Sequence, residues 1–219
     1  MNWLEYENFA LSKGYKIICG VDEAGRGPLA GPVYAAAVIL PEGHVIEGVN
    51  DSKKISEKKR DMLYDKIIDE CVCWNVGVAS VSEIDEINIL QATFLAMRRA
   101  VDGLKIKPDI ALIDGNARPG LDIDEMTVVK GDAKSASIAA ASILAKVSRD
   151  RYMLEMAKQY PQYQFEKHKG YGTKLHYEML REYGISPIHR KTFLKKFLSD
   201  TKQMYFLLHI IRSISPNLV

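Results

Sequence analysis

Apolar residues along the chain form short runs that are typical of strands and longer periodic stretches that are typical of helices. Runs rich in β-branched and small apolar residues predict strands at 17–23, 33–40, 72–81, 109–114 and 126–129. Apolar residues at helical spacing predict helices at 2–12, 57–70, 87–101, 136–160 and 174–183, with further helical segments to 213. Strands that alternate with helices in this way indicate an α/β fold.

The chain shows no internal repeat, low-complexity region or linker. We therefore expect one domain over 1–219, with an α/β core at 15–160 and a helical extension at 161–219. Ser56 is placed to cap the 57–70 helix, and Pro161 ends the 136–160 helix. The segment at 204–211, MYFLLHII, predicts a packed terminal helix.

Composition adds little about partners. The chain has 219 residues, 47% of them hydrophobic, and a formal net charge of +2. Basic residues outnumber acidic ones from 167 to 202, which suits either a phosphate backbone or a solvated helical surface. The three cysteines lack zinc spacing, and the N-terminal residues do not resemble a signal peptide, so we expect a cytoplasmic protein. No run approaches the roughly 18 apolar residues of a membrane-spanning helix.

The most informative stretch is IICGVDEAGRGPLAGPV at 17–33, in which a strand leads two adjacent carboxylates into a glycine-rich turn. Side chains of Asp22 and Glu23 would point to opposite faces of a continuous strand, so they share one site only if Gly25 and Gly27 break the strand. Backbone amides at those glycines, with Arg26 beside them, suit a phosphate, and acids next to a phosphate imply a metal. A tight turn with a solvated acidic pair is the alternative.

The spacing of Gly25, Gly27 and Gly31 also has to be compared with the dinucleotide-binding fingerprint. It is one residue longer than that fingerprint, and the residues after Gly31 predict a strand instead of the phosphate-binding helix. A nicotinamide-dependent oxidoreductase is therefore disfavoured.

Two further acids lie beside predicted strand ends. Asp114 ends the 109–114 strand, and Asp132 precedes the 136–160 helix, whose N-cap is Ser135. Ligands of open α/β sheets collect at the carboxyl ends of strands, where Asp22 and Asp114 would meet. The amides at the start of the 136–160 helix, with Lys146, suit a phosphate, although Asp132 alone fits a capping or surface acid equally well.

Two polar segments are candidates for contacts with nucleic acid. Residues 162–173 interleave Tyr163, Phe165 and Tyr171 with basic residues, which is what base stacking and phosphate contact require. In the polar stretch 50–56, Lys53 suits a phosphate contact, and a solvated loop is the competing interpretation.

Several motifs together resemble the type 2 ribonucleases H, specifically bacterial ribonuclease HII. They are GVDEAGRGP at 20–28, DSKK at 51–54, IDG at 113–115, KGDAKS at 130–135 with AASILAKV at 140–147, and HKGYGT at 168–173. They occur in the family's order and span nearly the whole chain. The related ribonuclease HIII has a long N-terminal domain and usually a Glu as its last acid, and this chain has neither.

The resemblance implies a ribonuclease H-like fold, with a central mixed five-stranded sheet flanked by helices and a helical C-terminal extension. It implies an endoribonuclease that hydrolyses the RNA strand of RNA–DNA hybrids and incises 5′ of single ribonucleotides in duplex DNA, leaving 3′-hydroxyl and 5′-phosphate ends. Such an enzyme removes ribonucleotides during DNA replication and repair.

The resemblance also assigns roles to residues. The catalytic acids are Asp22, Glu23, Asp114 and Asp132, which suit two divalent ions, Mg²⁺ or Mn²⁺. The residues implied to bind the substrate are Gly25, Arg26, Gly27 and Tyr171, of which Tyr171 senses the 2′-hydroxyl. A second set is expected to contact phosphates or to position the acids: Lys53, Ser135, Lys146 and His168. A non-catalytic nucleic-acid-binding module remains the alternative, although four acids would repel phosphate without metals. No interface pattern is apparent, so we expect a monomer.

Overall fold

A mixed five-stranded sheet forms the centre of the protein, in a computed structural model that describes residues 3–49 and 55–200. Its strands are β1 (Ile18–Ala24), β2 (Val33–Ile39), β3 (Cys73–Ala79), β4 (Ile110–Asp114) and β5 (Asp124–Val128). They lie in the order β3-β2-β1-β4-β5, with β1 antiparallel to β2 and parallel to β4. The expected mixed five-stranded sheet is confirmed.

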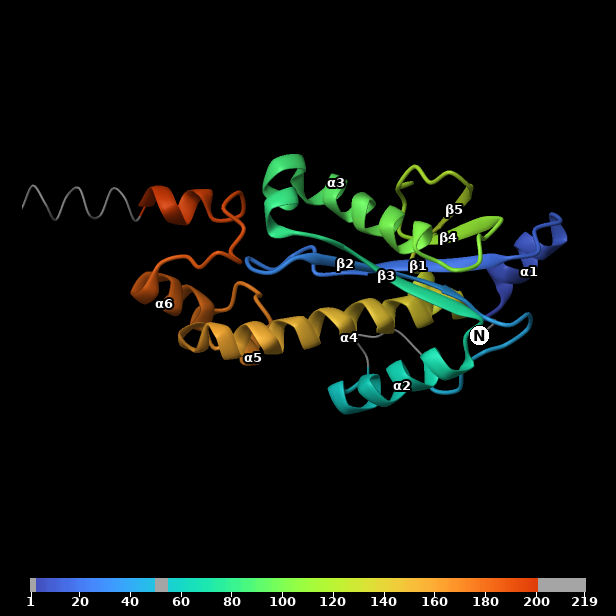
Figure 1. Cartoon of the computed structure of the whole chain (residues 1–219), viewed down its shortest axis with the longest axis horizontal. Helices are drawn as coiled ribbons and strands as arrows, with labels where there is room; N and C mark the ends of the chain where they lie inside the picture. Colours follow the sequence, from blue (N-terminus) through green and yellow to red (C-terminus); the bar gives the residue numbers. More distant parts are fainter. Residues whose placement is uncertain (1–2, 50–54, 201–219) are drawn as a thin grey trace, which may run out of the picture.

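Helices cover both faces of this sheet (Figure 1). The helix α3 (Val81–Asp102) packs on one face, and α2 (Glu57–Glu70) and α4 (Ala136–Gln159) pack on the other. The remaining elements are α1 (Glu5–Ser12), α5 (Phe165–His168), α6 (Lys174–Tyr183) and the short 3₁₀ turns η2 (Gly131–Ala133) and η3 (Pro161–Tyr163). Within the described residues, none of these helices has both the length and the apolar character needed to cross a membrane.

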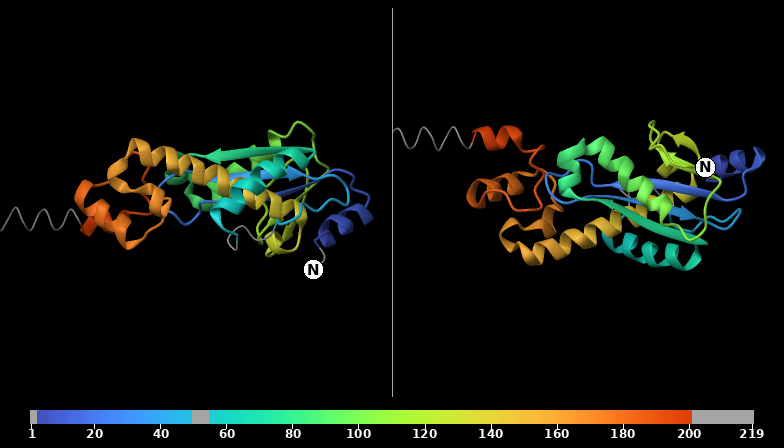
Figure 2. Two further views of the ribbon diagram at one scale, coloured as in Figure 1. Left: turned by 90° about the horizontal axis from the view of Figure 1, so that it is seen from below. Right: turned by 45° about the horizontal axis from the view of Figure 1, so that its top comes forward.

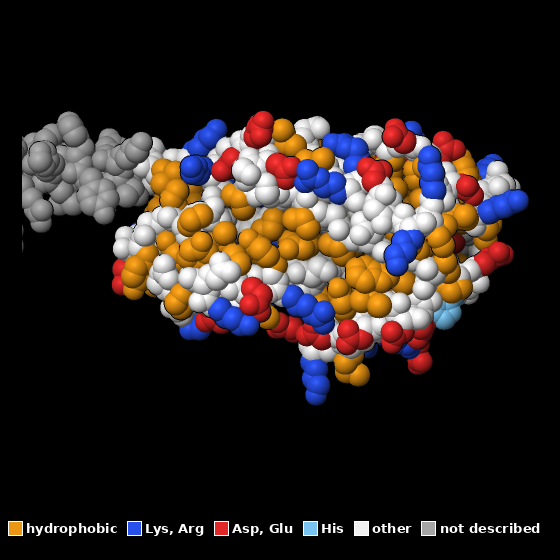
Figure 3. Space-filling model, in the orientation of Figure 1, with side chains coloured by type: hydrophobic (Ala, Val, Ile, Leu, Met, Phe, Trp, Pro, Cys, Tyr) orange, Lys and Arg blue, Asp and Glu red, His pale blue; other side chains and the backbone are white. Residues whose placement is uncertain are grey.

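The sequence of β2, VYAAAVI, shows why both faces are covered. Ala35 and Ala37 pack in the cluster that contains α3, whereas Ala36 and Val38 pack in the cluster that contains α2 and α4. A strand that is buried on both sides loses the alternation of apolar and polar residues. Seen toward β3, hydrophobic side chains gather along the middle of the molecule and charged ones lie mostly along its upper and lower rims (Figure 3).

The helix α4 approaches the sheet unusually closely. A Cβ atom on Gly20 of β1 would lie 2.1 Å from the backbone carbon of Ser137 and 2.2 Å from the nitrogen of Ile138. The alanines 139–141 continue this small-residue surface and are fully buried. The Ala- and Ser-rich start of the helix thus serves backbone packing.

The second half of α4 extends past the sheet and supports the C-terminal part of the chain (Figures 1 and 2). There Met153 packs with Phe165 and Leu180, and with Leu29 and Ala30 from the β1–β2 connection. The β1–β2 connection is therefore held between the α/β core and the C-terminal segments.

Some elements differ from the sequence prediction. The helix α3 starts at Val81, six residues before the expected start at 87, with a capping box in which Ser80 and Glu83 satisfy each other's backbone amides. It kinks at Asn88, whose φ is +69° and whose side chain caps the second segment through Leu90 and Gln91. The expected helix at 204–211 lies outside the described residues.

The contact at Gly20 gives a stability prediction. Gly20→Ala should lower the free energy of unfolding by about 3 kcal/mol, because the new methyl group meets backbone that cannot move independently of α4. Gly43→Ala is the control: its φ is +72° and no atom lies within 4 Å of the added carbon, so we expect a loss of about 1 kcal/mol from backbone strain alone. Chemical denaturation measures both, and equal losses would contradict the close approach.

Candidate active site

A cleft of about 230 Å³ opens at the carboxyl end of β1. Its lining combines the strand end, the glycine-rich turn, α4 and the α5–α6 connection. The residues are Asp22, Glu23, Ala24, Gly25, Arg26, Gly27, Ser142, Lys146 and Tyr171. Segments far apart in the sequence, around 25, 146 and 171, therefore share one site.

Asp22 is the electrostatic centre of this cleft. It is only 7% exposed, and its Oδ1 accepts a hydrogen bond from the Glu23 amide at 2.7 Å. Burial raises the pKa of Asp22 well above its ordinary value, and the negative charges of Glu23, Asp114 and Asp132 raise it further. The other three acids expected from the sequence are thus close enough to Asp22 to repel its charge.

Backbone contacts place Asp114 and Asp132. Asp114 is the last residue of β4, and its Oδ1 accepts a hydrogen bond from the Gly131 amide at 2.6 Å. Asp132 follows directly within η2, whose preceding residue Lys130 has a left-handed backbone. The hydrogen bond therefore draws the turn that carries Asp132 toward the end of β4.

The donor set fits divalent cations. Four carboxylates supply the hard oxygen ligands that Mg²⁺ and Mn²⁺ prefer, and a cation would relieve the repulsion on the buried Asp22. Within the described ranges, no three acidic, His or Cys side chains already form a group that could hold a metal ion.

The break in β1 lies one residue later than the sequence suggested. Pairing with β2 continues through Ala24, opposite Tyr34, and the chain turns at Gly25, whose φ is +99°. Glu23 still lines the same cleft as Asp22, and its Oε1 lies 3.4 Å from the Arg26 guanidinium. The two acids therefore border one cleft although the strand continues through both.

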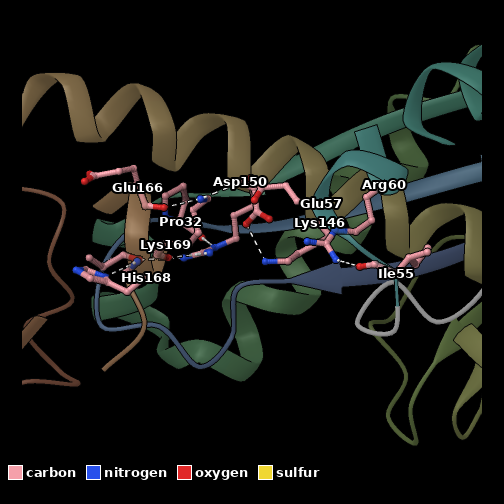
Figure 4. Close-up of polar contacts among 12 residues, drawn as sticks. Pro32, Ile55, Glu57, Arg60, Lys146, Asp150, Glu166, His168 and Lys169 are labelled. Atoms are coloured by element: carbon pink, nitrogen blue, oxygen red, sulfur yellow. Dashed lines mark hydrogen bonds and ion pairs between the residues drawn. The ribbon is translucent and has the colours of Figure 1, made fainter. Parts of the chain in front are cut away.

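The glycine turn faces Tyr171 across the cleft. A Cβ on Gly27 would meet only the Tyr171 ring, at 3.9 Å, and the Tyr171 side chain is 43% exposed. Lys146 Nζ lies 5.9 Å from the centre of that ring and forms an ion pair with Asp150 at 2.8 Å (Figure 4). Lys146 and Tyr171 thus border the cleft together.

Two residues expected at the substrate have other positions, and a third lies outside the described residues. Ser135 is fully buried; its hydroxyl accepts from the Ile138 amide and donates to Glu7 Oε1, so a carboxylate of α1 occupies the helix start where a phosphate was expected. His168 is 6% exposed, and its Nε2 donates to the Tyr163 carbonyl. Lys53 lies outside the described residues.

The prediction of a stacking surface at 162–173 is wrong for two of its three aromatics. Tyr163 and Phe165 are 2% and 0% exposed and stack on each other with ring centres 5.3 Å apart. The 3₁₀ turn η3 and the short α5 turn these rings inward, and only Tyr171 remains at the cleft.

Four buried basic residues near the cleft were not predicted. The side chains of Arg149 and Arg190 bind backbone carbonyls of the β1–β2 connection, and His176 and His189 bind each other at 2.9 Å. Each contact joins distant parts of the chain, so no local pattern of residues could have indicated it.

Comparison with known proteins agrees with this geometry. The family profile described as "Ribonuclease HII" matches residues 19–196. A ribonuclease HII of Caldicellulosiruptor bescii is 57% identical over 198 residues, which cover 90% of this chain and 96% of that protein. The chain belongs to the ribonuclease HII family. Ribonuclease HII is an endoribonuclease that cleaves RNA in RNA–DNA hybrids and at embedded ribonucleotides, and the family uses divalent metals.

Solved structures support the same fold. The crystal structure of ribonuclease H2 from Pyrococcus horikoshii has a TM-score of 0.68 at 31% identity, covering 81% of this chain and 93% of that one. A ribonuclease HII from Archaeoglobus fulgidus, solved as a complex with PCNA, has a TM-score of 0.64 at 26% identity, covering 80% and 94%. The ribonuclease H-like architecture is thereby confirmed.

The buried histidines give a prediction for stability in acid. Burial lowers the pKa of His176 to about 4 and that of His189 to about 3, whereas both have a pKa of about 6.5 in the unfolded chain. As pH falls below about 6.5 the unfolded chain takes up protons that the folded protein excludes, so the free energy of unfolding should fall toward pH 4.

Urea titrations at pH 7, 6 and 5 test this dependence. In His176→Asn the unfolded chain has one fewer histidine to protonate. The unfolding free energy of this variant should therefore depend less steeply on pH than that of the parent protein. An identical slope in the variant would show that other groups cause the acid sensitivity.

Proposed function

We propose that this ribonuclease HII hydrolyses the RNA strand of RNA–DNA hybrids and incises 5′ of single ribonucleotides in duplex DNA at the cleft around Asp22. The products would carry 3′-hydroxyl and 5′-phosphate ends. The observation that carries this assignment is the coupling of four carboxylates around buried Asp22, in a cleft that also presents a glycine turn and an exposed tyrosine. We further propose that the chain acts as a cytoplasmic monomer in ribonucleotide removal during replication and repair.

Asp22, Glu23, Asp114 and Asp132 are proposed to hold two divalent ions, Mg²⁺ or Mn²⁺. When bound, such ions activate a water and stabilise the leaving oxyanion of a phosphodiester. The buried carboxylate of Asp22 feels the charges of the other three acids, so a cation held there would relieve that repulsion. The hydrogen bonds from Glu23 and Gly131 amides leave the second oxygens of Asp22 and Asp114 for metal.

The remaining walls of the cleft are proposed to bind the substrate. Arg26 is exposed beside the acids and can pair with a phosphate, and the Arg26 and Gly27 amides have no acceptor within the described part of the chain. Lys146 offers a second positive charge. The ribose at the junction would lie between this turn and the Tyr171 ring, and its 2′-hydroxyl is the only group there that distinguishes RNA from DNA.

The other residues assigned by resemblance are proposed to act indirectly. Ser135 caps the helix that carries Lys146, and His168 bonds the Gly170 amide next to Tyr171. Both would position groups that touch the substrate. Lys53 keeps its proposed phosphate contact on the sequence motif alone.

The direct test is cleavage of a labelled DNA duplex that contains one ribonucleotide, with all-DNA duplex and a long hybrid as controls. We expect a nick 5′ of the ribonucleotide that requires Mg²⁺ or Mn²⁺, with no cleavage of all-DNA duplex. Cleavage of the long hybrid alone would overturn the assignment of Tyr171 to the junction ribose. Binding without cleavage under either metal would favour a non-catalytic module.

Asp22→Asn tests the metal assignment. It should abolish cleavage, at least about 10³-fold, while the melting temperature without metal stays the same or rises, because one of four repelling charges is removed. The rise in melting temperature on adding Mn²⁺ should shrink. Asp61→Asn is the matched control, because Asp61 pairs with Arg151 on the surface and does not line the cleft. Full activity of Asp22→Asn would refute Asp22 as a ligand.

A further inference from the structure

The two walls of the cleft are held by one pair of neighbouring residues, His189 and Arg190. We propose that this pair, with His176, is a positioning device that fixes the glycine turn relative to Tyr171 and thereby sets how well a single ribonucleotide is recognised. This inference rests on the proposed placement of the junction ribose between those walls.

Backbone pairing first fixes the pair against the β1–β2 connection. Ala30 and His189 form an antiparallel bridge. The Gly31 amide donates to the Ile188 carbonyl at 2.8 Å, and the Arg190 amide donates to the Leu29 carbonyl at 2.8 Å. Successive side chains of an extended segment point to opposite sides, so His189 and Arg190 can reach different partners.

Arg190 reaches the glycine turn. Its Nη2 donates to the Gly25 carbonyl at 2.6 Å, its Nη1 to the Arg26 carbonyl at 2.9 Å and its Nε to the Gly31 carbonyl at 2.8 Å. The rigid fork of the guanidinium thus ties both ends of the turn to one planar group. A lysine at 190 would keep the charge and lose that geometry.

Arg149 of α4 completes this arrangement. It donates to the carbonyls of Ala30, Pro32 and Lys169, and its Nε occupies the space that a Cβ on Gly25 would need. Both guanidiniums are 0% exposed, and neither forms an ion pair within the described residues. Buried charges require hydrogen bonds, so the carbonyls of the turn must point inward, which leaves the Arg26 and Gly27 amides for the cleft.

His189 reaches the opposite wall through His176. The Ser186 amide donates to His189 Nδ1 at 2.8 Å, so the His189 proton lies on Nε2 and is donated to His176 Nε2 at 2.9 Å. The His176 proton then lies on Nδ1 and is donated to the Tyr171 carbonyl at 2.9 Å. This chain of donors fixes both tautomers and holds the backbone of Tyr171.

The pair therefore adds to two other contacts between these surfaces, the hydrogen bond from the Leu29 amide to the Gly170 carbonyl at 2.8 Å and the bonds of Arg149 to Ala30 and Lys169, and it is the contact that reaches the Gly25 and Arg26 carbonyls and the Tyr171 carbonyl. A Cβ added to Gly27 would lie 3.9 Å from the Tyr171 ring, which is van der Waals contact. Small shifts of either wall therefore change the gap that a ribose must fit. Misplacement by about 1 Å can cost on the order of 100-fold in rate. A long hybrid, which can be cleaved at many positions, should depend less on that gap.

The variants separate an effect on the position of the cleft walls from an effect on folding stability. Arg190→Lys removes the fork, and His176→Phe removes the bond to Tyr171. His176→Asn retains a donor near the Nδ1 position and should preserve that bond. Tyr163→Phe is the matched control: it removes only the hydroxyl, which bonds the Tyr183 and Gly184 carbonyls, and it keeps the ring that packs on His189. Melting temperatures are recorded for all four.

The readout is kcat and KM, with Mn²⁺, on a single-ribonucleotide duplex and on a long hybrid. We expect Arg190→Lys and His176→Phe to lower kcat/KM on the single ribonucleotide about 10-fold more than on the hybrid, with His176→Asn and Tyr163→Phe within about 3-fold of the parent ratio. Equal losses of kcat/KM on both substrates would overturn the positioning role. The role would also be overturned if Tyr163→Phe and His176→Phe lost kcat/KM in proportion to their changes in melting temperature, because lower stability would then explain both losses.

Tyr171→Ala separates this inference from the function on which it rests. If Tyr171→Ala leaves single-ribonucleotide incision unchanged, the placement of the ribose beside Tyr171 fails, and the positioning role fails with it. If Tyr171→Ala lowers incision and neither Arg190→Lys nor His176→Phe changes the substrate ratio, the positioning role alone is refuted.

Discussion

The backbone contact between α4 and β1 at Gly20 is the constraint on which the site depends. Because no side chain separates the two elements, α4 lies at a fixed height above the strand that carries Asp22. The same helix then supplies Lys146 to the cleft, Arg149 to the glycine turn and Met153 to the C-terminal cluster. One close approach therefore fixes the distances among the acids, the substrate wall and the lobe behind it.

Several charged groups around the cleft are buried in a way that lowers the stability of the fold. Burial and three neighbouring acids raise the pKa of Asp22, and two guanidiniums lie buried without carboxylate partners in the described part of the chain. Each group costs folding free energy in the absence of ligand. The acids favour cations in the cleft, and the guanidiniums orient the backbone of its rim. The groups that lower the folding stability are therefore the same groups that form the site.

The sequence predicted those features whose determinants are local. Strand-end acids, the glycine turn and the cap at Ser56 could all be located from neighbouring residues, and the sheet followed from the apolar runs. Arg149 and Arg190 could not, because all but one of their carbonyl partners lie more than 100 residues away and any residue supplies a carbonyl. Tyr163 and Phe165 were misjudged because their direction depends on a 3₁₀ turn that the aromatic and basic pattern does not indicate. The capping box at Ser80 and Glu83 was a local signal for the start of α3 that the apolar spacing obscured.

The position of Arg190 in the chain has a consequence for local unfolding. All four acids precede residue 133, whereas His189 and Arg190, which hold the turn at Gly25, lie in a separate segment more than 50 residues later. Local opening of that segment would release the turn while the sheet that carries Asp22 and Asp114 stays folded. The rim of the cleft and its acids can therefore differ in local stability.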